Sequence, residues 1–133
     1  MPTNVTVTAS VQWTPPSAPA NSGTATFNVV ASVNAQNVGQ IDVQTSDPPG
    51  AIFPMPFGSV ATAKVVCIKN MMSSEVGVRV NGHVTNDFRV PAGGMIMYAA
   101  PVGPNSEPLS AVSIVTTASP AAIEAVQFFI YGD

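Results

Sequence analysis

The residue types that could do chemistry are few in this chain. It has one histidine, His83, and one cysteine, Cys67. A Ser-His-Asp catalytic unit would need that histidine, and Asp87 follows it four residues later. We interpret His83 as a polar residue beside a turn, because that is the ordinary role of such a histidine. Cys67 lies inside the apolar run 63–68, so we expect a buried small side chain there.

Other kinds of reactive site lack their ligands in the sequence. A metal site needs clustered histidine, cysteine or carboxylate side chains. The seven acidic residues are dispersed and form no Asp-x-Asp pair. The glycine-rich segment 92–94 lies between two expected strands, whereas a phosphate-binding loop precedes a helix. We therefore expect no enzymatic activity, no metal and no cofactor.

Charge is scarce, which limits the kinds of partner. Charged residues make up 8% of the 133 residues, compared with about 25% in a typical soluble domain. The net charge is −3, and the four basic residues are Lys64, Lys69, Arg79 and Arg89. Nucleic acids and anionic membranes are bound by clustered cations, so we expect neither as a partner. A nearly neutral surface suits a protein that is packed within an assembly.

The chain has no recognisable targeting or membrane segment. Its first ten residues lack the basic and apolar regions of a signal peptide. No apolar run approaches the roughly 20 residues of a membrane-spanning helix. We expect a soluble chain that is made in a cytoplasm, with a length typical of one domain.

The elements that must position these residues are β-strands. Residues 5–13 alternate between apolar and polar side chains, and residues 24–34 do the same, which is the period of a half-buried strand. The run 122–131 is apolar on both faces, so it is expected in the middle of a sheet or in a subunit interface. Turn signals recur every 8–12 residues. The sequence predicts an all-β fold, an antiparallel, jelly-roll-like β-sandwich of eight or nine short strands.

The N-terminal part is separated from the rest by a proline-rich stretch. Residues 14–23 contain three prolines, which remove backbone donors and favour an extended chain. We expect residues 1–23 to form a strand and linker that can act as an exchange arm. Residues 24–133 are expected to form the β-sandwich domain.

The stretch 60–90 predicts a β-meander. Residues 60–69 are apolar on both faces, as in a central strand. A loop and a second strand, 75–80, follow. Asn81-Gly82 is a strong signal for a two-residue hairpin turn. The returning strand, 83–90, offers Val84, Phe88 and Val90 as core residues.

Three segments are candidates for contact with another chain: the first strand, the apolar proline-rich segment 53–57 and a methionine pair in a loop. Segment 53–57 either plugs the core or forms an exposed ridge. The methionines either adapt to a partner or pack as a lid. The candidate interface residues are Val5, Val7, Val11, Trp13, Phe53, Met55, Phe57, Met71 and Met72.

From residue 60 onward the chain resembles small β-sandwich virion proteins of tailed bacteriophages. The resemblance lies in six short stretches: Ile68-Lys69-Asn70, the Val-x-Val-x-Val run 76–80, Asn81-Gly82, the Val-Pro-Ala-Gly-Gly run 90–94, the Leu-Ser-Ala-Val-Ser-Ile run 109–114 and the closing Phe-Ile-Tyr-Gly-Asp. It implies a capsid decoration, or cement, protein with a jelly-roll fold and no catalytic residues.

The resemblance also implies a location and partners. Such a protein is made in the host cytoplasm and lies on the capsid surface of the virion, where it binds the major capsid protein. Because homo-oligomers are usually symmetric, we expect a homodimer or homotrimer. The alternative is a phage tail or fibre module that binds a carbohydrate receptor, with sugars stacked on Trp13, Tyr98 or Tyr131.

Overall fold

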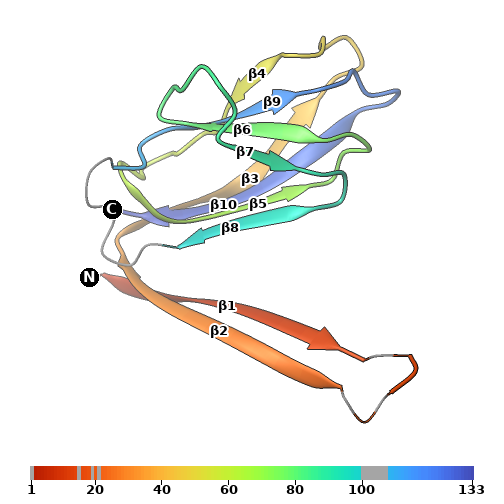
Figure 1. Ribbon diagram of the computed structural model, residues 1–133. Helices are drawn as coiled ribbons and strands as arrows, with labels where there is room; N and C mark the ends of the chain where they lie inside the picture. The colour runs from red at the N-terminus through yellow and green to blue at the C-terminus, as the bar shows by residue number, and fades with distance from the viewer. Residues whose placement is uncertain (1, 15, 19, 21, 100–107) are drawn as a thin grey trace.

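The protein is an antiparallel β-sandwich that carries a projecting two-stranded ribbon (Figure 1). The computed structural model describes residues 2–14, 16–18, 20, 22–99 and 108–133, with the side chain of Trp13 left out. These residues form ten strands in three sheets. The all-β, antiparallel sandwich is therefore confirmed, with more strands than the eight or nine expected.

The strands follow one another along the chain without an intervening helix in the described part. The ribbon pairs β1 (Thr3–Trp13) with β2 (Gly23–Val33). The first four-stranded sheet has the order β3 (Ala35–Val43), β10 (Glu124–Gly132), β5 (Ala63–Asn70), β8 (Met95–Ala99). The second has the order β4 (Ile52–Pro54), β9 (Val112–Thr116), β6 (Val76–Val80), β7 (Phe88–Val90).

The pairing within the sandwich is nested. β3 pairs with β10, β4 with β9, β5 with β8 and β6 with β7, and every pair is antiparallel. The eight strands therefore behave as one long hairpin whose two halves run side by side. Two further pairings, β10 with β5 and β9 with β6, join neighbouring pairs into the two sheets.

The core lies between the two four-stranded sheets. In β10, Val126, Phe128 and Ile130 are buried there, while the alternate residues Gln127 and Phe129 face outward. The facing sheet contributes Val76, Val78, Val112 and Ile114. Each such side chain stabilises the fold by about 1.5–3 kcal/mol when it leaves water. This contact holds the two sheets together.

The expected meander at 60–90 is wrong. β5 is indeed a central strand, but it pairs with β10 and β8, while β6 lies in the opposite sheet. The chain crosses from one sheet to the other after Asn70. The crossing places the apolar faces of β5 and β6 against each other across the core.

The expected two-residue hairpin is also wrong in part. Asn81 and Gly82 do form a turn with positive φ values of 50° and 76°. The return strand β7, however, starts only at Phe88. Residues 83–87 form a loop outside the sheet, which leaves Val84 exposed. Phe88, at the start of β7, is also exposed, so neither residue is in the core.

Segment 53–57 covers the core and forms no exposed ridge. Phe53 is in the short edge strand β4, where it pairs with Ile114. Met55 is buried in the core, and Phe53 and Phe57 pack against it. The prolines of this segment are compatible with β4 because an edge strand needs donors on one side only.

One buried polar side chain ties two loops together. The Asn70 side chain is fully buried at the end of β5. Its Nδ2 donates to the carbonyl oxygens of Ser74, Val90 and Pro91 at 2.8, 3.1 and 3.0 Å. Its Oδ1 accepts from the Met72 amide at 2.9 Å. Every polar atom of the amide is thus paired where the chain changes sheets.

We predict that Asn70→Ala lowers the free energy of unfolding by about 2–3 kcal/mol, because it leaves buried carbonyl oxygens and an amide without partners. Urea unfolding followed by circular dichroism measures the loss. Asn28→Ala, on the exposed polar face of the ribbon, is the matched control and should change stability by less than about 0.5 kcal/mol. Equal losses in the two variants would contradict this role for Asn70.

Candidate functional site

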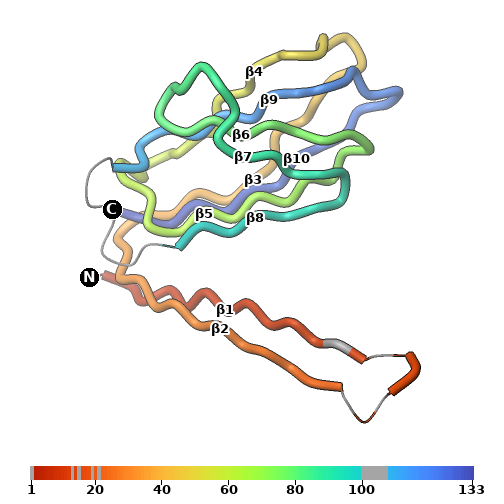
Figure 2. The backbone as a smooth tube through the Cα atoms, viewed as in Figure 1, coloured from red at the N-terminus to blue at the C-terminus, as the bar shows by residue number. Residues whose placement is uncertain are grey.

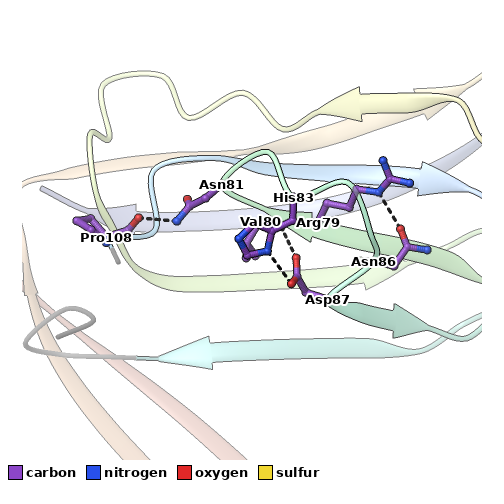
Figure 3. A network of polar contacts seen from close by, with 7 residues as sticks. All are labelled: Arg79, Val80, Asn81, His83, Asn86, Asp87 and Pro108. Carbon is purple, nitrogen blue, oxygen red and sulfur yellow. Dashed lines mark hydrogen bonds and ion pairs between the residues drawn. The ribbon is translucent and has the colours of Figure 1, made fainter. Parts of the chain in front are cut away.

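The polar residues between β6 and β7 are the first candidate site (Figure 3). The loop folds back because the Val80 amide donates to Asp87 Oδ2 at 2.8 Å and the Asp87 amide donates to the Val78 carbonyl at 2.8 Å. The imidazole Nδ1 of His83 donates to Asp87 Oδ1 at 2.8 Å. Arg79 Nε donates to Asn86 Oδ1 at 3.1 Å.

The electrostatics of this loop favour a charged carboxylate. The hydrogen bond from His83, followed by the one from the Val80 amide, holds the pKa of Asp87 below its ordinary range. Both bonds are made to the ionised form. Asp87 therefore joins the two ends of the loop.

The His83–Asp87 pair could be one part of a catalytic triad, and the third part would be a nucleophile. Cys67 lies on β5, in the other sheet from the strands that flank this loop. Burial raises the pKa of the Cys67 thiol, which keeps it protonated and unreactive. Within the described residues, no three His, Cys, Asp or Glu side chains are close enough together to hold a metal ion. The contacts that the pair does make brace the loop.

We predict that Asp87 stabilises the fold at neutral pH and loses this effect in acid. Because its pKa is lowered on folding, the unfolded chain binds more protons as the pH falls, so stability falls with it. The free energy of unfolding should be higher for the parent chain than for Asp87→Ala at pH 7, and the gap should shrink below about pH 4. Asp42→Ala, which removes an exposed carboxylate elsewhere, controls for net charge. A gap that stays constant from pH 7 to pH 3 would contradict the prediction.

The second candidate site is the ribbon formed by β1 and β2. Their register pairs Val5 with Ala31, Val7 with Val29, Ala9 with Phe27 and Val11 with Ala25. All of these side chains are apolar and share one face, because alternate residues of a strand point the same way. The other face carries Asn4, Thr6, Thr8, Ser10, Gln12, Thr24, Thr26, Asn28, Val30 and Ser32.

The ribbon has one apolar face and one polar face, and it carries no charged side chain. The first acidic or basic side chain in the sequence is Asp42, which lies beyond β2 in β3. The projecting unit, Thr3–Val33, includes the expected strand at 24–34 as well as most of the expected arm, residues 1–23. Figure 2 shows the two strands running together away from the sandwich.

The base of the ribbon is seated on the sandwich. Ala31 and Val33 are buried against Val65 of β5, and Ala99 and Tyr131 pack around them. The apolar face of the ribbon thus rests on the outer face of the first sheet, which is the face turned away from the core.

Polar contacts fix the base in place. Lys64 Nζ donates to the Ser32 carbonyl at 2.8 Å and pairs with the Asp133 carboxylate at 2.5 Å. The backbone N–H of Asn34 donates to the Gly132 carbonyl oxygen at 2.8 Å. Asn34 is also the single residue between β2 and β3, so the ribbon has little freedom to rotate about its base.

Away from the base, two apolar surfaces lie open. On the distal half of the ribbon, Val11 is 55% exposed and Phe27 is 64% exposed. On the outer face of the first sheet, the register aligns one side chain from each strand into an outer row: Val38, Phe129, Cys67 and Met97. Val38, Phe129 and Met97 are 51%, 41% and 39% exposed.

The interface residues expected from the sequence are divided by the fold. Val5 and Val7 pack at the base of the ribbon, and Val11 is open on its distal half. Met71 is exposed in its loop. Met55 and Met72 are buried in the core, and Phe53 and Phe57 are partly buried against it. The backbone of Trp13 ends β1, and its side chain lies outside the described residues.

Sequence reasoning missed two groups of open residues. Phe27 and its neighbours in β2 were assigned to the sandwich, although their alternation matches that of β1 residue for residue. The outer row was missed because its members come from four separate strands. The apolar nature of both faces of 122–131 was the available signal for it.

Comparisons with family models, with curated proteins and with solved structures find no match to this chain. The described part of the chain contains no helix that is long and apolar enough to cross a membrane.

Proposed function

We propose that this protein is a structural component of a virion that binds and stabilises a capsid lattice as a homo-oligomer. The observation that carries the proposal is the uncharged ribbon, whose apolar face is covered at the base and open beyond it. Monomeric soluble proteins rarely leave large contiguous apolar patches exposed. An open apolar face is expected where another protein covers it.

The topology supports the virion proposal at the level of fold. Nested pairing of eight strands, with the sheet orders β3-β10-β5-β8 and β4-β9-β6-β7, is what a long hairpin gives when it is rolled into two sheets. We infer that the sandwich is a jelly roll, a fold used by viral capsid proteins. The resemblance of residues 60–133 to small β-sandwich virion proteins of tailed bacteriophages supports a place in the particle, and the same pattern occurs in tail and fibre proteins.

The carbohydrate-binding alternative has less support. Sugars usually stack on open aromatic rings, and two of the three candidate rings are engaged. Tyr98 packs against the core, and Tyr131 packs beneath the base of the ribbon.

We predict that particles carrying this chain contain it in numbers comparable to the subunits of the lattice, and that particles lacking it lose their contents at a lower temperature. Quantitative mass spectrometry of purified particles measures the first, and thermal release of packaged nucleic acid measures the second. Adding back the purified chain should restore the stability. A His83→Ala chain is the matched control and should restore it equally, because the proposal gives His83 no role in binding.

A copy number of a few per particle would contradict the proposal. So would particles of unchanged stability after removal of the chain. Failure of His83→Ala alone to restore the particles would point instead to a role for the polar loop between β6 and β7.

A further inference from the structure

The base of the ribbon shows which kind of surface the apolar face of the ribbon packs on. At the base, the apolar face of the ribbon covers Val65, Ala99 and Tyr131 on the outer face of the first sheet. In the register of that sheet these residues form one row across β10, β5 and β8. The outer row, Val38, Phe129, Cys67 and Met97, lies two residues further along the same strands. Within one chain, the apolar face of the ribbon therefore already packs on the outer face of the first sheet. Further apolar side chains of the ribbon and of this sheet face stay exposed.

Within the outer row, Cys67 is partly buried against the cluster at the base of the ribbon, whereas Val38, Phe129 and Met97 are 51%, 41% and 39% exposed. The residues of the ribbon that pack on the sheet come from its base, Val5, Val7, Ala31 and Val33. Beyond them the ribbon leaves the sheet (Figure 2). The contacts of Lys64 with Ser32 and Asp133, and the one-residue connection at Asn34, hold the ribbon at that angle.

The open half of the ribbon needs cover for its own stability. A two-stranded hairpin alone in water is at best marginally stable. The open half offers Ala9, Val11, Ala25, Phe27 and Val29 on one face and has no charged group to attract a charged partner. Its complement is an apolar and uncharged surface, and the outer row of this same chain consists of apolar side chains without a charge.

We propose that the open half of the ribbon of one copy packs on the outer row of a second copy, and that the second copy returns the same contact. This inference rests on the proposed function in one respect, since it names the partner within the homo-oligomer. The arrangement has two-fold symmetry, the commonest symmetry of homo-oligomers. Each copy buries two patches at once, its ribbon and its outer row. Doubling the area in this way helps the pair approach the roughly 800 Å² per partner of a standard interface.

The test uses the purified full chain without capsids, with mass measured by light scattering after size exclusion. We expect the mass of two chains. Phe27→Lys on the ribbon and Val38→Asp on the outer row should each weaken dimerisation by about 100-fold or more, because a charge would be buried without a partner. Circular dichroism of each variant checks that the sandwich is folded.

Matched controls are available for both substitutions. Val30 is 54% exposed on the polar face of the same ribbon strand, and Ile52 is 54% exposed on β4 in the other sheet. Val30→Lys and Ile52→Asp place the same charges on exposed apolar residues outside the proposed contact. Both should remain dimeric.

Mixing the two monomeric variants gives the sharpest result. A pair of one Phe27→Lys chain and one Val38→Asp chain has one unaltered contact and one that joins a lysine to an aspartate-bearing surface. The mixture should therefore dimerise although neither variant does so alone. A monomeric parent chain, a trimer, or loss of the dimer in the control variants would overturn the proposal. A monomer that still binds particles in stoichiometric amounts would overturn this inference and leave standing only the binding of the capsid lattice. A dimer that binds no particles would support this inference and overturn the proposed function.

Discussion

The structure depends on a sheet whose inner face is apolar and whose outer face is apolar in part, along the row under the base of the ribbon and the outer row next to it. The inner face of β3-β10-β5-β8 is covered by the second sheet, and this contact forms the core. The outer face is covered in part by the base of the ribbon, while Val38, Phe129 and Met97 stay open. Burying a fully exposed side chain of this kind is worth about 1.5–3 kcal/mol, and these half-exposed side chains retain part of that. The free energy still available on this face is what makes an assembly partner the simplest explanation of it.

The same constraint explains why the ribbon is part of the fold and not a loose tail. Val33 and Ala31 are buried against Val65, so detaching the ribbon would expose apolar groups on both sides. The ion pair of Lys64 with Asp133 brings the C-terminal residue to the base of the ribbon. The N-terminal and C-terminal parts of the described chain thereby fix the direction in which the open apolar face points.

The sequence predicts the class of fold well because strand alternation is a local property. Val5 to Val11 and Ala25 to Val33 show the period of two plainly, and the sheets bear it out. Pairing is not local, so the partner of each strand was harder to predict. The meander at 60–90 failed because nothing in Asn70–Ser74 reveals that the chain crosses between sheets. The outer row was invisible for a similar reason, since Val38 and Phe129 are 91 residues apart and become neighbours through the register of β3 and β10.

The most direct test of the account is a distance across the interface. In a mixture of ¹³C-labelled and unlabelled chains, isotope-filtered NMR detects protons within about 5 Å that belong to different copies. The account predicts contacts between the Met97 methyl group of one copy and the Val11 or Phe27 side chains of the other. Signals of the Met97 methyl group and of the Phe27 ring that show contacts within a single copy alone, in a sample that is dimeric, would contradict it.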